Sequence, residues 1–134
     1  MASVDPILDR LGRQGLQILV ENRGKLAFAS DRTGPAPLRH LGLHRPELLD
    51  GADVALPAVG LGAAYLLIAA KVGRVFSKVM THEAHKAFEA EGIEHGSKEK
   101  VKRLAAEEPL GALDERARAA ATMLAFVEEL KTAP

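Results

Sequence analysis

The longest apolar run of the chain, ALPAVGLGAAYLLIAA at 55–70, is the feature that most constrains the fold. It contains Pro57, Gly60 and Gly62, and it falls short of the roughly 18 to 20 apolar residues that a membrane-spanning helix needs. The run is apolar on every side, which is typical of a helix that is buried all round. We therefore predict a central helix, ended by Gly73, that other elements cover on both sides.

Before this run, the pattern predicts a helix, a β-hairpin and a long loop. Asp5 is a plausible N-cap, with Pro6 at the first helical position and apolar residues at helical spacing behind it. Two β-prone segments, 18–21 and 25–30, flank an Asn-Arg-Gly sequence that suits a tight turn. The segment 31–52 is rich in proline and charge, so we expect a loop with at most one helical turn.

After the central helix, strand and helix patterns alternate. No tight-turn sequence precedes the β-rich segment that follows Gly73, which suits a strand reached by a crossover connection. The remaining expectations are a strand at 74–80, a helix at 83–91, at most a short strand near Ile93, a short basic helix at 98–106 capped by Ser97, and a last helix at 113–130.

This order of elements predicts an α/β fold in the form of a three-layer αβα sandwich. We expect a mixed sheet of about four to five strands, with an antiparallel hairpin and parallel strands joined by helices. A length of 134 residues is typical of one core, so residues 1–134 are expected to form a single domain. In such sheets ligands bind beyond the carboxyl ends of the strands, near helix N-termini.

Three blocks of the sequence, LVENRGKLAFASDRTG, LLDGADVALPAVGLGAAYLLI and GRVFSKVMTHEAHKAFEAEGI, resemble in order those of the domain-of-unknown-function family DUF1893. The resemblance implies a cytidine deaminase-like fold without zinc ligands and without an established activity. Where many relatives carry Asp-Lys and then Gly-Lys-Ala, this chain has Leu56-Pro57 and Gly60-Leu61-Gly62, so any role of those lysines does not carry over. Leu110 stands near a position where relatives often have a cysteine.

The candidate ligand-binding residues follow the second strand or stand at two predicted helix starts. Thr81 is a good N-cap and Glu83 complements the helix dipole, but free amides there could also bind an anion with help from His82. A lone Gly-x-Gly is a weak phosphate signature, and small residues more often allow a neighbouring element to approach closely. The candidates are Ser30, Asp31, Thr33, Gly60, Gly62, Thr81 and His82.

His82 and His85 pose the question of a metal site, because residues three apart share one face of a helical turn. Zinc deaminases need ligands from two helix starts and a glutamate proton shuttle. The other start, 58–62, reads Ala-Val-Gly-Leu-Gly, and the chain has no cysteine. Two ligands leave zinc incompletely coordinated, so we expect neither a metal site nor a cofactor.

Three classes of function stay open. The first is a non-catalytic small-molecule-binding or regulatory module. The second is a metal-independent enzyme acting on a nucleobase-like or amide-containing molecule, with His82 or His85 as general acid or base and Glu83 or Asp31 as its partner. The third is a structural oligomerisation protein. The sequence assigns no role to His40 and His44.

Composition narrows the partners and the location. Eighteen basic residues balance eighteen acidic ones, and aromatic residues make up 4% of the chain, so we expect no nucleic-acid binding. The charged N-terminal segment does not resemble a secretory signal, which favours the cytoplasm, and no membrane association is expected. The alanine-rich stripe around Ala117, Ala121, Leu124 and Phe126 predicts a homodimer or larger homo-oligomer with helices in the interface.

Overall fold

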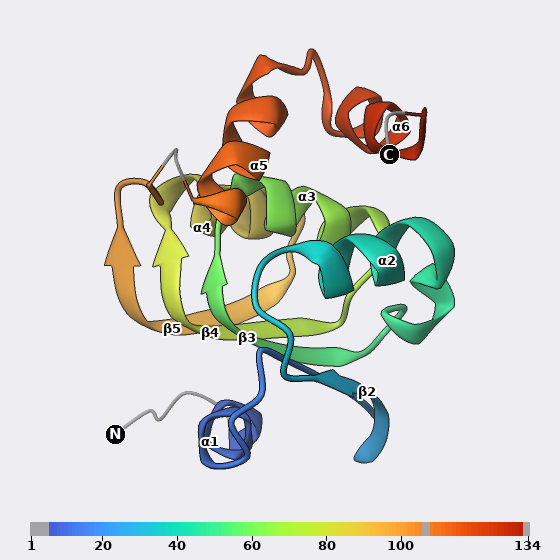
Figure 1. Cartoon of the computed structure of the whole chain (residues 1–134), viewed down its shortest axis with the longest axis vertical. Helices are drawn as coiled ribbons and strands as arrows, with labels where there is room; N and C mark the ends of the chain where they lie inside the picture. Colours follow the sequence, from blue (N-terminus) through green and yellow to red (C-terminus); the bar gives the residue numbers. More distant parts are fainter. Residues whose placement is uncertain (1–5, 106–107, 133–134) are drawn as a thin grey trace.

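The computed structural model of the protein describes residues 6–105 and 108–132. Within these residues the chain forms a five-stranded sheet with six α-helices and one short 3-10 helix (Figure 1). The elements are α1 (Pro6–Arg13), β1 (Ile18–Asn22), β2 (Lys25–Ser30), α2 (Ala36–His44), η1 (Pro46–Leu48), β3 (Asp53–Val59), α3 (Leu61–Ala69), β4 (Arg74–Thr81), α4 (His82–Ala90), β5 (Glu94–Val101), α5 (Pro109–Ala119) and α6 (Met123–Thr132).

The sheet has the strand order β2-β1-β3-β4-β5 and is mixed. β1 pairs antiparallel with both β2 and β3, whereas β3, β4 and β5 run parallel. The parallel strands are joined through α3 and α4, as expected for crossover connections. The α/β class and the mixed sheet of four to five strands are therefore confirmed, and the arrangement is consistent with an αβα sandwich.

The described helices cover the two faces of the sheet unequally. α1 lies below the sheet in Figure 1, where Ile7, Leu8 and Leu11 pack against Leu19 and Phe76. The other helices lie above it, with α3 in the middle and α5 and α6 stacked on its outer side. α3 is buried almost throughout, because sheet residues cover one side of it and neighbouring helices cover the other. The prediction of a central, fully covered helix is confirmed.

The predicted central helix was too long, because its first part is the strand β3. Val54, Ala55 and Leu56 are buried and lie between β1 and β4. Pro57 lies beyond the β1 ladder, which ends at Ala55, so its missing N–H removes no hydrogen bond to that neighbour. A short apolar run suits a buried parallel strand as well as a buried helix, and periodicity alone does not separate the two.

The predicted basic helix at 98–106 is wrong, since Glu94–Val101 forms β5. Its residues pair with β4 from Glu94 to Val101, and Ser97 lies within the ladder opposite Ser77 rather than at a helix start. β5 is an edge strand with exposed charges, a composition that discourages pairing with other chains. Main-chain pairing with β4 thus overrides the helical propensity of the charged residues.

Two further expectations need correction. The segment 31–52 is more ordered than a loop, because it contains the nine-residue helix α2 and the 3-10 helix η1. The last helix is divided into α5 and α6, and Thr122 caps the second of these by accepting a hydrogen bond of 3.0 Å from the Ala125 N–H. The predicted cap Asp5 lies outside the described residues.

The hairpin prediction is confirmed by the pairing of β1 with β2. Arg23 and Gly24 both have positive φ, 53° and 78°, as a two-residue turn of this kind requires. Each described helix is too short or too polar to cross a lipid bilayer.

Candidate functional site

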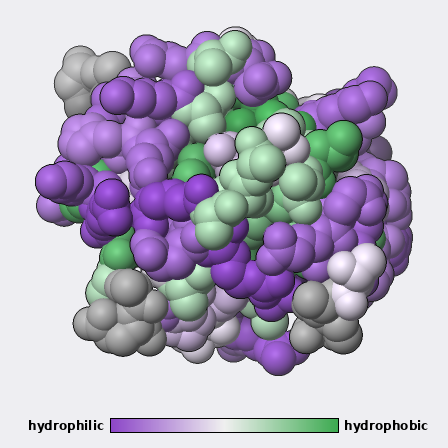
Figure 2. All heavy atoms as spheres, turned by 90° about the horizontal axis from the view of Figure 1, so that it is seen from above, coloured by the Kyte–Doolittle hydropathy of each residue, from purple (hydrophilic) through white to green (hydrophobic). Residues whose placement is uncertain are grey.

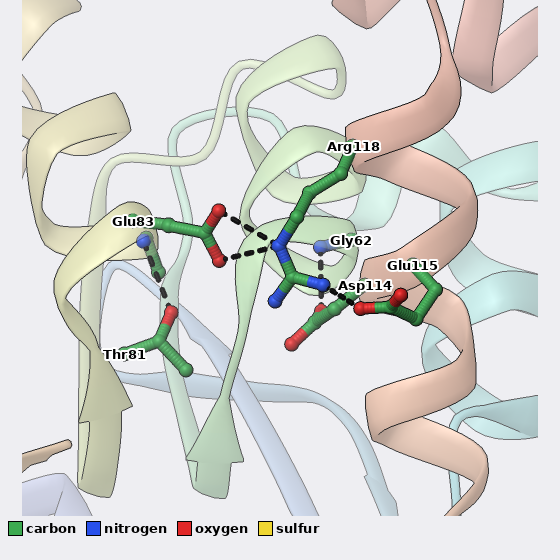
Figure 3. Close-up of polar contacts among 7 residues, drawn as sticks. Gly62, Thr81, Glu83, Asp114, Glu115 and Arg118 are labelled. Atoms are coloured by element: carbon green, nitrogen blue, oxygen red, sulfur yellow. Dashed lines mark hydrogen bonds and ion pairs between the residues drawn. The ribbon is translucent and has the colours of Figure 1, made fainter. Parts of the chain in front are cut away.

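The candidate site lies at the carboxyl ends of β3 and β4, where α3 and α4 begin and α5 crosses above them (Figure 3). Thr81 is the N-cap of α4, and its hydroxyl oxygen accepts a hydrogen bond of 3.1 Å from the Ala84 N–H. Gly60 is the N-cap of α3 and offers no side chain to its free amides. The start of α3 therefore needs an acceptor from elsewhere in the chain.

Asp114 of α5 supplies that acceptor. Its Oδ1 accepts a hydrogen bond of 2.8 Å from the Gly62 N–H, and its side chain is only 1% exposed. A Cβ atom on Gly60 would lie 2.0 Å from Asp114 Oδ2, and one on Gly62 would lie 2.7 Å from Leu113 Cγ. The two glycines therefore let α5 approach the start of α3 closely, which is the packing role that the sequence favoured.

The Asp114 carboxyl is poised to titrate close to neutral pH. Burial raises its pKa to about 6, while the hydrogen bond from Gly62 and the charge of Arg118 act in the opposite direction. The carboxylate charges of Glu83 and Glu115 add to the increase. Its Oδ2 atom is buried and has no hydrogen-bond partner among the described residues. Such a group is found more often at functional sites than elsewhere.

An ion pair between Arg118 and Glu83 ties α5 to the start of α4. The Nε of Arg118 donates to both carboxylate oxygens of Glu83, at 2.9 and 2.8 Å, and Nη1 donates to Glu115 (Figure 3). The hydrogen bond from Arg118 lowers the pKa of Glu83, and the same bond raises the pKa of Arg118. Asp114 and Arg118 lie one helical turn apart, so a single face of α5 meets both helix starts.

The site is closed as it stands. α5 places the Asp114 carboxylate on the start of α3, where a helix N-terminus would otherwise bind an anion. Beside the end of β3 there is a cavity of about 40 Å³, lined among others by Pro57, Ala63 and Leu110, which has room for a few water molecules at most. A larger ligand can reach the Gly62 amide at the start of α3 only if α5 moves.

The predicted histidines do not form one catalytic group with Glu83. His82 is exposed on the first turn of α4, and Glu83 is held by Arg118. His85 contacts His95 of β5 instead, with 2.7 Å between its Nδ1 and His95 Nε2. Desolvation lowers the pKa of His85, and the nearby Lys100 lowers it further. Glu83 is therefore engaged with α5 rather than placed to orient an imidazole.

The residues after the second strand lie over a different part of the surface. The hydroxyl oxygen of Ser30 accepts a hydrogen bond of 3.1 Å from the Arg32 N–H, an arrangement common in turns. Ser30 lines a cavity beside α2, and Asp31 and Thr33 are exposed. The structure brings Gly60, Gly62 and Thr81 together but places this second set apart from them.

We predict that the purified protein contains no stoichiometric zinc or iron. Among residues 6–105 and 108–132, no three histidine, aspartate or glutamate side chains are close enough together to hold a metal ion. Metal analysis by mass spectrometry after dialysis should therefore give far less than one equivalent per chain. About one zinc ion per chain that survives dialysis would contradict the prediction.

Sequence reasoning missed Asp114 and Arg118, although they complete the site. The signal that pointed toward them is the pair of glycines at the start of α3, which indicates that some element approaches closely. The partner of Gly62 lies 52 residues further along the chain, and nothing local to Asp114 distinguishes it from a surface carboxylate. A pair of glycines therefore predicts a close contact but does not identify the residue that makes it.

Comparison with known proteins agrees with this fold. The family model described as "Domain of unknown function (DUF1893)" matches residues 7–108, and no curated protein matches the chain. A solved structure of a DUF1893 family protein from Thermotoga maritima is similar, with a TM-score of 0.74 and 21% sequence identity. The likeness covers 97% of this chain and 89% of that chain, and at this identity it shows the fold alone. On the family match, this chain belongs to the DUF1893 family.

Proposed function

We propose that the protein is a non-catalytic module that binds a small molecule or regulates a partner activity through the site where α5 meets α3 and α4. One observation carries this proposal: the Asp114 carboxylate is buried on the Gly62 amide, and its second oxygen has no partner among residues 6–105 and 108–132. Keeping such a group ionised at neutral pH opposes folding, and unfavourable groups of this kind concentrate where function needs them. We assign the sandwich to the cytidine deaminase-like folds without zinc ligands as part of the proposal.

In this proposal α5 is a cover that a ligand displaces. Two polar contacts hold α5 to the helix starts, Asp114 to Gly62 and Arg118 to Glu83. Leu113 and Ala117 of α5 are also buried in the core, so a ligand would have to displace this apolar packing as well. A ligand that offers an acceptor to Gly62 and a donor to Glu83 would replace both contacts when α5 moves. Small molecules that carry a carboxylate or amide oxygen together with an amino group have this chemistry.

The test uses Gly60→Ala, because the added methyl group would lie 2.0 Å from Asp114 Oδ2 and weaken the docking of α5. The groups that the ligand would contact, the Gly62 amide and the Glu83 carboxylate, are unchanged in this variant. Small amino acids and amides are titrated into both proteins, and the backbone amide NMR signals are recorded. We expect the signals of Gly62 and Ala84 to shift more strongly in Gly60→Ala than in the parent protein.

The matched control for this test is Gly12→Ala, where the methyl group would meet nothing within 4 Å. It should behave like the parent protein in the same titrations. If none of these compounds moves the Gly62 or Ala84 signals in Gly60→Ala, although hydrogen exchange shows that α5 has loosened, the proposed binding site is wrong.

A metal-independent enzyme is the second candidate, and one observation favours it. Burial raises the pKa of Asp114 to about 6, which suits a general acid or base near neutral pH. Asp114 would then take the role that the sequence suggested for His82 or His85, on an amide-containing or nucleobase-like substrate. Turnover of such a substrate that Asp114→Asn abolishes would favour the enzyme over the binding module.

The third candidate is a structural role in self-association, and exposed apolar residues of α5 and α6 support it. Leu124 is 66% exposed, and Ala119, Ala121 and Ala125 beside it are also exposed. Figure 2 shows apolar residues gathered in a band across the middle of the face seen from above. The stripe is narrower than the sequence suggested, because Ala117 and Phe126 are buried within the chain.

We predict that the protein is a homodimer or larger closed assembly that uses this surface. Leu124→Glu should stay folded, because the side chain is exposed, and should become monomeric, because it places a charge in an apolar interface. Light scattering at micromolar concentration measures both masses. A mass near 14.3 kDa for the unmodified protein would refute the prediction.

A further inference from the structure

A second part of the surface has the features of a binding site, and it lies along α2, away from the start of α3. Two cavities, of about 470 and 350 Å³, share Ala36 and His40 as lining residues. They therefore adjoin the same stretch of α2, and we call the two cavities together the α2 groove. Its lining residues are Phe28, Ser30, Arg32, Ala36, Pro37, Arg39, His40, Leu43, His44, Leu130 and Lys131.

The charged residues that line the α2 groove are all basic. Arg32, Arg39 and Lys131 are basic, and no acidic residue is among the described lining residues. Lys131 forms an ion pair with Glu128, which lies outside the groove. The whole chain carries equal numbers of basic and acidic residues, so this asymmetry is local. A groove lined by one sign of charge attracts ligands of the opposite sign.

The two arginines of the groove are available to a ligand. Within the part of the chain that the structure describes, neither the Arg32 nor the Arg39 guanidinium forms an ion pair or hydrogen bond. Arg45, just after the end of the same helix, is held by Glu47 and does not line the groove. Arginine binds carboxylates and phosphates with two parallel hydrogen bonds, so an unpaired guanidinium in each cavity favours an anionic head group.

The floor of the α2 groove is apolar. Pro37 and Leu130 are buried, and Phe28 and Leu43 are half-buried, so the floor joins α2 to β2 and to α6. His40 and His44 lie one helical turn apart, with their ring centroids separated by 5.6 Å, at the rim. An apolar floor with a few polar groups at its edge is the usual composition of a small-molecule site.

We infer that the α2 groove binds a small amphipathic anion, a carboxylate or phosphate joined to an apolar chain or ring. The anionic head lies against Arg39 with His40 as a further donor, and the apolar part covers Leu43 and Leu130, all of which line the same cavity. This inference does not depend on the function proposed for the start of α3, because the two sites share no residue.

The test is calorimetric titration with octanoate and octyl phosphate below their micelle concentrations. We expect saturable binding of at least one of these two compounds, and the one that binds more tightly shows whether the groove prefers a carboxylate or a phosphate. Octylamine has the same chain with the opposite charge and should not bind, and inorganic phosphate should bind at least about tenfold more weakly. Arg39→Gln should weaken binding by about tenfold or more, because it removes a charged donor. His40→Gln should weaken it by a smaller factor, because glutamine keeps a donor but places it differently.

Arg45→Gln is the matched control, since it removes a guanidinium from the end of the same helix but outside the groove. It should leave the affinity unchanged. The inference is overturned if neither octyl anion binds, if octylamine binds equally well, or if Arg39→Gln and His40→Gln both leave the affinity unchanged. If inorganic phosphate binds as tightly as octyl phosphate, the apolar chain contributes nothing to binding, and the inference of an amphipathic ligand is also overturned. Should Arg39→Gln unfold, His40→Gln provides the comparison from an exposed position in the same cavity.

Discussion

Replacing Gly62 by leucine is expected to lower the free energy of unfolding by about 3 kcal/mol, the upper end of the usual range for overpacking. The Cβ alone would lie 2.7 Å from Leu113 Cγ and 3.0 Å from the Leu113 carbonyl oxygen. Main-chain atoms cannot move aside as a flexible side chain can, so α5 must shift. That shift also separates Asp114 from the Gly62 amide and leaves a buried donor unpaired.

Chemical denaturation of the variant and of Gly12→Leu provides the measurement. Gly12 stands in α1, where an added Cβ would meet nothing within 4 Å, so leucine there should change stability little. If Gly62→Leu unfolds at the same denaturant concentration as the parent protein, α5 does not pack on α3 in the way described.

The sequence predicted those features whose causes are local. The β1–β2 hairpin follows from a turn sequence in which Arg23 and Gly24 adopt positive φ. The burial of α3 follows from a run with no polar face, and the capping of α4 follows from Thr81. In each case the residues that carry the signal are also the residues that form the contact, so no distant partner has to be known.

The sequence failed where pairing with a distant segment decides the structure. The segment 53–59 is a strand because β1 and β4 lie on either side of it, and its apolar character alone fits a helix equally well. Glu94–Val101 has the charged composition of a surface helix, yet β4 offers it a free edge to pair with. In both segments hydrogen bonds to another strand, and not the local residues alone, decide between strand and helix.

The same distinction applies to the candidate site. Its location was predicted, since the starts of α3 and α4 lie beyond the ends of two parallel strands whatever else the chain does. Its content was not, because Asp114 and Arg118 reach it from α5, a helix that lies after the segment matched by the family model. A carboxylate at a helix start cannot be inferred from glycines that merely leave space for it.

The pH dependence of stability tests how Asp114 is held. In the folded protein burial raises its pKa to about 6, whereas an unfolded chain has an aspartate pKa of about 3.9. Between these values the folded state keeps a proton that the unfolded state has lost. Raising the pH through this window therefore favours unfolding, and Asp114 removes up to about 3 kcal/mol of stability by pH 7.

The side chain introduced by Asp114→Asn cannot ionise, so the variant does not lose this stability as the pH rises. Its side-chain oxygen can still accept the hydrogen bond from the Gly62 N–H. We expect the stability of the variant minus that of the parent protein to rise by up to about 3 kcal/mol between about pH 4 and pH 7, and to be constant below that range. Urea unfolding at several pH values measures the difference, in which groups common to both proteins largely cancel. A difference that stays flat, or that falls as the pH rises, would mean that the Asp114 carboxylate is well solvated or paired and that α5 does not bury it against α3.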